Sequence, residues 1–132
     1  ELNLRSENFV CSVLACSSEK IKGLNAQFRG KNNSTNVLSF PSKAEKYDTK
    51  SSLKFKADAD PLELGDIAIA YEVCNKEAKV SKIKFEDHVY HLIIHSVLHL
   101  LGYDHEEEKN ATEMEKIEVQ VLANLGISNP YL

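Results

Sequence analysis

The chain has 132 residues, of which 42% are hydrophobic and 27% charged, and these are the proportions of a globular protein rather than of a disordered or fibrous one. The length is that of one domain, so we expect residues 1–132 to share one core, and no apolar run approaches the roughly 20 residues of a bilayer span, so we expect no membrane partner. The net charge is -4, yet residues 1–56 carry ten Lys or Arg and five Asp or Glu, whereas residues 57–132 carry six and fifteen. Such asymmetry is compatible with a basic face that meets phosphates, although charge runs are usually only solvated surfaces.

The three cysteines, Cys11, Cys16 and Cys74, cannot form a closed set of disulfides, and none belongs to a CxxC pair. We therefore expect small buried apolar residues in a reducing compartment. The N-terminus lacks Met and the features of a signal peptide, so we expect a processed or trimmed chain.

The first part of the chain predicts a strand, a helix and a second strand. Phe9–Cys16 is short, apolar and β-rich, and the serines that follow it supply an N-cap for a helix over Glu19–Arg29. Gly30 stands where that helix would end. Turn residues then lead to a strand over Thr35–Phe40, and Pro41 indicates that this strand is at an edge or has reached its end.

Residues 42–60 show no periodicity and carry many charges, which predicts a long surface loop or a loose hairpin. Leu62–Tyr71 alternates on both sides of Gly65-Asp66 but in different phase, as a strand with a bulge would. A helix is expected over Glu72–Val80.

Two further helices are expected. Phe85–Leu101 is apolar around most of its circumference and should be the central helix, which Gly102 ends. Asn110 with Glu113 resembles a capping box, and apolar residues continue at helical spacing from there to Gly126.

Histidines gather on the central helix. His88, His91, His95 and His99 follow one another at spacings of three or four, so they line one stripe of the helix. A buried histidine can be satisfied by backbone carbonyls, so one alternative is a hydrogen-bonded histidine cluster without metal.

The segment from His95 to His105 favours a metal site. His95 and His99 are four residues apart, so their imidazoles converge on one ion, and Gly102 lets the chain turn so that His105 returns to the same ion. Three histidines with one open position describe a catalytic zinc site. His91 could be a fourth ligand only if the helix bent, because His91 and His99 are more than two turns apart.

This is the HExxHxxGxxH spacing of zinc peptidases with one difference. The position of their general-base glutamate is Ser96 here, and a serine cannot take a proton from a metal-activated water at neutral pH. The peptidase mechanism is therefore not supported, although the metal geometry is.

The segment His95–His105 (HSVLHLLGYDH) closely resembles the hallmark of the YbeY family of single-metal endoribonucleases of bacteria and organelles, His-Gly-x-Leu-His-Leu-x-Gly-Tyr-Asp-His. Further matches in the family's order span residues 24 to 126 and are Leu24-Asn25, Arg29-Gly30-Lys31, Thr35–Pro41, Gly65-Asp66-Ile67, and Met114 with Glu118, Leu122 and Leu125-Gly126. Ser96 replaces the family's usual Gly, and Ser34 stands where a Pro is common. The chain begins near the end of the family's first helix, so we expect the family's first strand and helix to be missing.

The resemblance implies an α+β, zincin-like fold, in which a small mixed β-sheet packs against a central metal-binding helix and flanking helices. It implies one Zn²⁺ per chain held by His95, His99 and His105, with Arg29 and His95 as catalytic residues. The ion would either activate a water or polarise a phosphoryl oxygen, and the fork of Arg29 suits a phosphate. Asp104 could assist an imidazole or be a turn residue.

The resemblance also implies the biological setting. It predicts a hydrolase that processes ribosomal RNA, including the 3′ end of the small-subunit RNA, in contact with the ribosome or its assembly factors, in the bacterial cytoplasm or an organellar matrix. Two alternatives stay open, namely a ribosome-assembly module that binds RNA with a structural zinc and does not cut it, and a metallopeptidase-like hydrolase with an unusual base. The general base and the oligomeric state are not predicted.

Overall fold

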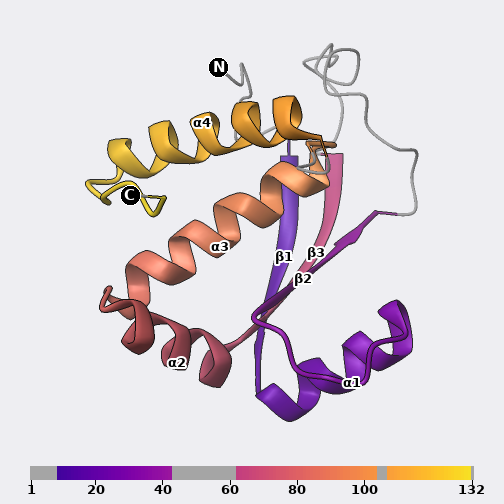
Figure 1. The fold of residues 1–132 in the computed structure, drawn as a ribbon. Coiled ribbons are helices and arrows are strands. Elements are labelled where there is room, and N and C mark those ends of the chain that lie inside the picture. The colour runs from indigo at the N-terminus through magenta and orange to yellow at the C-terminus, as the bar shows by residue number, and fades with distance from the viewer. Residues whose placement is uncertain (1–8, 43–61, 104–106, 132) are drawn as a thin grey trace.

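The structure is a computed structural model that describes residues 9–42, 62–103 and 107–131. In these ranges it contains three strands and four helices, which in chain order are β1 (Phe9–Cys16), α1 (Ser18–Arg29), β2 (Val37–Pro41), β3 (Leu62–Ala70), α2 (Tyr71–Ser81), α3 (Phe85–Leu100) and α4 (Glu108–Asn124). The strands form one sheet in the order β1-β3-β2, with β1 parallel and β2 antiparallel to the central strand (Figure 1). This confirms the α+β class with a small mixed sheet.

Helices cover both faces of the sheet because neighbouring residues of β3 point to opposite sides. Ile67 belongs to an apolar cluster with Leu98 of α3 and Met114 of α4. Ala68 belongs to a second cluster, with Ile21 of α1. In Figure 1, α3 and α4 accordingly lie on one side of the sheet and α1 lies on the other. The histidine-bearing helix α3 therefore packs directly on the sheet, as expected for a central helix.

The bulge expected in β3 is present. The parallel pairing moves from Val10 opposite Glu63 to Cys11 opposite Gly65, so the extra residue is Leu64, one position before the expected Gly65-Asp66. Gly65 has φ +138°, and a Cβ atom at this position would lie 2.2 Å from the carbonyl oxygen of Phe40. The glycine thus allows β2 to approach β3 closely.

In the described part of the chain, β2 is an edge strand. Hydrogen bonds from Ala70 N to Asn36 O and from Ser42 N to Leu64 O frame its pairing with β3. Because hydrogen-bonded and non-hydrogen-bonded pairs alternate in an antiparallel ladder, the backbone groups of Ser39 and Pro41 point away from β3. Pro41 can therefore belong to the strand, which begins two residues later than Thr35 and includes the proline expected to follow it.

The ends of α1 follow the sequence signals. The Oγ of Ser17 accepts a hydrogen bond from the backbone N of Lys20 at 3.1 Å, and Gly30 closes the helix in the left-handed conformation with φ +69°.

The capping box expected at Asn110 is wrong. Helix α4 begins at Glu108, its N-cap residue Glu107 makes no side-chain cap bond, and Asn110 lies inside the first turn. Acidic residues at the start of a helix are stabilised by its dipole, so this helix extends beyond the asparagine towards Glu107 and Glu108.

All three cysteines are free thiols, but only Cys74 is fully buried. Burial, with a smaller contribution from Glu77, raises the pKa of Cys74 to about 11. Cys11 and Cys16 are only half-buried, so the expectation of buried cysteines is correct for one of the three. The loop or hairpin expected over residues 42–60 lies outside the described residues, except for Ser42.

Within the described ranges, no helix combines the length and the apolar character needed to cross a membrane.

Candidate active-site groove

Helix α3 directs His95 and His99 towards one another. The two residues are one helical turn apart, and their Nε2 atoms lie 3.0 Å apart with ring centroids separated by 4.6 Å. The side chain of His95 is 26% exposed, so this pair lies at the surface of the core and can be reached from outside.

The other ring nitrogens of this pair are held by acceptors. The Nδ1 of His99 lies 3.1 Å from the backbone oxygen of Tyr103, and the Nδ1 of His95 lies 2.5 Å from Oε1 of Glu118. A carbonyl oxygen or an ionised carboxylate can only accept, so in the neutral rings each Nδ1 carries the proton and each Nε2 carries a lone pair.

Two lone pairs that face each other at 3.0 Å repel unless they share a cation. Neutral imidazole nitrogens that converge in this way are ligands of the kind that zinc prefers. The donor set of His95 and His99 therefore fits a metal ion.

The acceptor for His95 is a buried carboxylate. Glu118 is 0% exposed, and besides His95 it contacts Nε2 of His91 at 3.1 Å and the hydroxyl of Tyr131, which donates to it. Burial alone raises the pKa of Glu118, but the hydrogen bonds from His91, His95 and Tyr131 outweigh it and lower the pKa to about 2. Glu118 is thus ionised at neutral pH.

A groove of about 540 Å³ opens beside the histidine pair. It lies between α3 and the edge strand β2, and the residues that line it are Arg29, Asn36, Val37, Leu38, Ser39, Pro41, Leu92, His95, Ser96, His99 and Leu100. The groove therefore brings a cation from the end of α1 to the same space as the two imidazoles, although Arg29 is 66 residues before His95.

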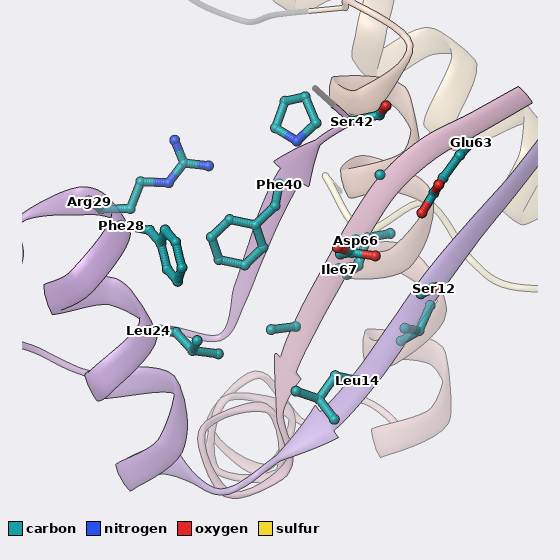
Figure 2. Close-up of a pocket in the computed structure, with 14 residues that line it drawn as sticks. Ser12, Leu14, Leu24, Phe28, Arg29, Phe40, Ser42, Glu63, Asp66 and Ile67 are labelled. Carbon is teal, nitrogen blue, oxygen red and sulfur yellow. The ribbon is translucent and has the colours of Figure 1, made fainter. Parts of the chain in front are cut away.

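Arg29 is held at the edge of β2 that points away from β3. Its Nη2 donates to the backbone oxygen of Ser39, and its guanidinium carbon lies 5.7 Å from the centre of the Phe40 ring. Figure 2 shows the other side of this edge, where Arg29 lies beside Phe28 and Phe40 at the rim of a second pocket of about 990 Å³. Arg29 thus borders both pockets.

Ser96, the residue at the position of the peptidase glutamate, is 1% exposed. Its Oγ has no hydrogen-bond partner among the described residues. No proton-accepting side chain therefore stands at this position of the groove.

The histidine stripe is divided between several partners. The Nε2 of His88 contacts Glu77 at 2.9 Å, away from the groove, and that of His91 contacts Glu118. His105 and Asp104 lie outside the described residues. Within the described ranges, no group of three or more His, Cys, Asp or Glu side chains could hold a metal ion.

Glu118 is the residue of this site that the histidine spacing does not predict. Besides its place in the family resemblance, its signal in the sequence is that of an acidic residue four positions after Met114 and four before Leu122, on the apolar stripe of α4. All three of these residues are buried.

Known proteins resemble this chain along most of its length. The family model described as Endoribonuclease YbeY matches residues 1–126. Endoribonuclease YbeY of Jannaschia sp. (strain CCS1) is 44% identical over 131 residues, which are 99% of this chain and 81% of that protein. Endoribonuclease YbeY of Ruegeria sp. (strain TM1040) is 46% identical over 137 residues, covering 99% of this chain and 79% of that protein.

The fold is also similar to that of a solved structure. The solution structure of TM1509 from Thermotoga maritima superposes with a TM-score of 0.59 at 30% identity. The match covers 86% of this chain and 66% of that one.

Proposed function

The chain belongs to the YbeY family of endoribonucleases, hydrolases that act on RNA, and on this premise we propose that it cuts RNA in the groove between α3 and β2 with the help of a metal ion. The observation that carries the proposal is the convergence of the Nε2 atoms of His95 and His99, which lie 3.0 Å apart. Arg29 lines the same groove, and its guanidinium gives the groove a group that can bind the phosphate of the substrate.

We propose that the ion is Zn²⁺, one per chain, with His105 as the third ligand beside His95 and His99. When bound, zinc supplies Lewis-acid chemistry and lowers the pKa of water. The protein's part is to orient the two imidazoles so that their Nε2 atoms face the ion, and the Nδ1 contacts of His95 to Glu118 and of His99 to the oxygen of Tyr103 support this role. That the fold is zincin-like is part of the same proposal, because a zincin-like fold is defined by a metal-binding helix, which here is α3.

Arg29 is proposed to bind the scissile phosphate. A guanidinium has five N–H donors in a planar fork, and the bond to Ser39 uses one nitrogen, Nη2, of the three. This bond and the contact with the Phe40 ring restrain the guanidinium at the rim of the groove, so that charge growing on phosphoryl oxygens would meet a positioned donor. Ser96, which stands at the position of the peptidase glutamate, is buried and cannot serve as the general base. No residue is therefore assigned to that role.

The proposed substrate is ribosomal RNA, with processing of the small-subunit 3′ end as the reaction and the ribosome or its assembly factors as partners. We propose a single domain over residues 1–132 that works in the bacterial cytoplasm or an organellar matrix. These points rest on the family, whose members are named as endoribonucleases.

The test is cleavage of a defined RNA by the native protein, with and without a chelator, together with zinc content by elemental analysis. His99→Ala should lose both zinc and cleavage. His88→Gln is the matched control on the same helix, because His88 contacts Glu77 outside the groove, and it should keep both. Zinc that is retained by a native protein which binds RNA but cuts none would support the assembly-module alternative, and cleavage of peptides instead of RNA would support the peptidase-like one.

A further inference from the structure

Glu118 is a buried charge that pairs with neither Lys nor Arg among the described residues. Its side chain is 0% exposed, and its partners in the described part of the chain are two imidazoles and a phenol rather than Lys or Arg. Removing a carboxylate from water costs several kcal/mol, and apolar side chains of similar volume often stabilise a core at least as well. Stability alone therefore does not explain this residue, and the groups that it contacts suggest its role.

The two carboxylate oxygens of Glu118 have different partners. Oε1 lies 2.5 Å from Nδ1 of His95, whereas Oε2 lies 3.1 Å from Nε2 of His91 and accepts from the hydroxyl of Tyr131. The contacts at Oε2 fix the rotation of the carboxylate, and Oε1 is then aimed at one ring nitrogen of His95. One oxygen anchors the group while the other holds the imidazole.

Tyr131 reaches this site from beyond the end of α4. Its backbone N donates to Oδ1 of Asn129 at 2.8 Å, and its ring lies edge-to-face with that of His91, with centroids 5.4 Å apart. The segment after α4 therefore folds back onto α3, and its phenol completes the set of donors around Glu118.

We propose that Glu118 is a positioning residue of the metal site, which accepts a hydrogen bond from Nδ1–H of His95 and so keeps the Nε2 lone pair directed towards His99 and the ion, with Tyr131 holding the carboxylate in place. The inference rests on the proposed metal site. An imidazole fixed in this way is a more basic and better oriented ligand, and loss of such a partner typically weakens metal binding by roughly 10- to 100-fold.

The test compares Glu118→Gln with Glu115→Gln in the full chain. Glu115 is exposed on the same helix, so its variant makes the same change in charge without touching His95. The zinc dissociation constant is measured by competition with a chromophoric chelator, and the imidazole protons of the zinc-loaded proteins are observed by NMR. We expect zinc binding to weaken by roughly 10- to 100-fold in Glu118→Gln and to stay native in Glu115→Gln.

NMR gives a second readout that a purely structural role would not change. In the native protein the proton of His95 should be on Nδ1, far downfield and slow to exchange, and in Glu118→Gln it should move upfield and exchange faster. Tyr131→Phe, a milder change at a half-exposed ring, should weaken zinc binding in the same direction by a smaller factor.

Three results would overturn the inference. The first is a folded Glu118→Gln that keeps native zinc affinity and an unchanged His95 proton. The second, if Glu118→Gln does not fold, is a Tyr131→Phe variant that keeps native zinc affinity. The third is a native protein whose His95 binds zinc through Nδ1. A native protein that binds no zinc would instead refute the proposed function and the inference together.

Discussion

Replacing Arg29 by Ala tests whether the groove acts on phosphate. The change removes a guanidinium that lines the groove with His95 and His99. If that group stabilises charge on the phosphoryl oxygens, its loss should lower the rate of RNA cleavage by about 10²–10³, which is the usual effect of removing one such donor. Zinc content should stay native, because Arg29 contacts neither imidazole directly in the described structure.

The same change should lower stability by a small amount that follows from its contacts. One hydrogen bond to the oxygen of Ser39 contributes about 1 kcal/mol at an exposed site, and the contact with the Phe40 ring adds about 0.5–1 kcal/mol. For a chain of this size we expect the melting temperature to fall by about 4–8 °C. The protein should therefore remain folded in the activity assay.

The assay is single-turnover cleavage of a defined RNA, with melting curves and zinc analysis on the same samples. Arg29→Lys should recover little activity, because a point charge does not replace a planar fork. Lys22→Ala, an exposed basic residue of the same helix, controls for net charge and should cleave like the native protein. RNA binding by Arg29→Ala should also depend less steeply on salt, by about one unit of slope.

Cleavage at the native rate by Arg29→Ala would refute the assignment. A loss of cleavage that Lys22→Ala shares equally would indicate a general effect of charge. A fall in melting temperature well beyond 8 °C would instead give Arg29 a structural role at the edge of β2.

Three further predictions concern the stability of the fold. Gly65→Ala should destabilise the fold by at least about 2 kcal/mol, because the new Cβ would meet the backbone of Phe40. Gly23→Ala has open space around it in α1 and should raise the unfolding free energy by about 0.5–1 kcal/mol. Denaturant unfolding compares the two variants. Burial raises the pKa of Cys74 to about 11, against an unfolded value near 9, so the stabilisation of the fold by the neutral thiol is complete below pH 9 and is lost as the pH rises from 9 through 11. The unfolding free energy of Cys74→Ala should therefore fall less steeply over that range than that of the native protein. Ser96→Ala removes a buried hydroxyl without a partner among the described residues and should raise the unfolding free energy by about 1 kcal/mol at native zinc content. A fall in the unfolding free energy would show that the hydroxyl makes a stabilising hydrogen bond.

Features that depend on neighbours along the chain can be predicted from the amino-acid sequence alone. Local sequence patterns predicted every described strand and helix, with bounds correct to within about two residues except at the start of α4, and Gly30 marked the end of α1 as expected. The pairing of His95 with His99 also follows from local geometry, since residues four apart on a helix lie on one face. The start of α4 was placed wrongly at Asn110 because capping residues are common inside helices as well, and the pattern alone does not choose between them.

The surroundings of the histidine pair, in contrast, depend on packing between elements that are distant in the sequence. Glu118 follows His95 by 23 residues and Arg29 precedes it by 66, and no periodic pattern connects elements so far apart. Their meeting depends on how α4 packs on α3 and how α1 ends beside the outer edge of β2. The division of the histidine stripe has the same origin, because an imidazole's partner is set by the acceptor that packing brings to it, Glu77 for His88 and Glu118 for His91 and His95.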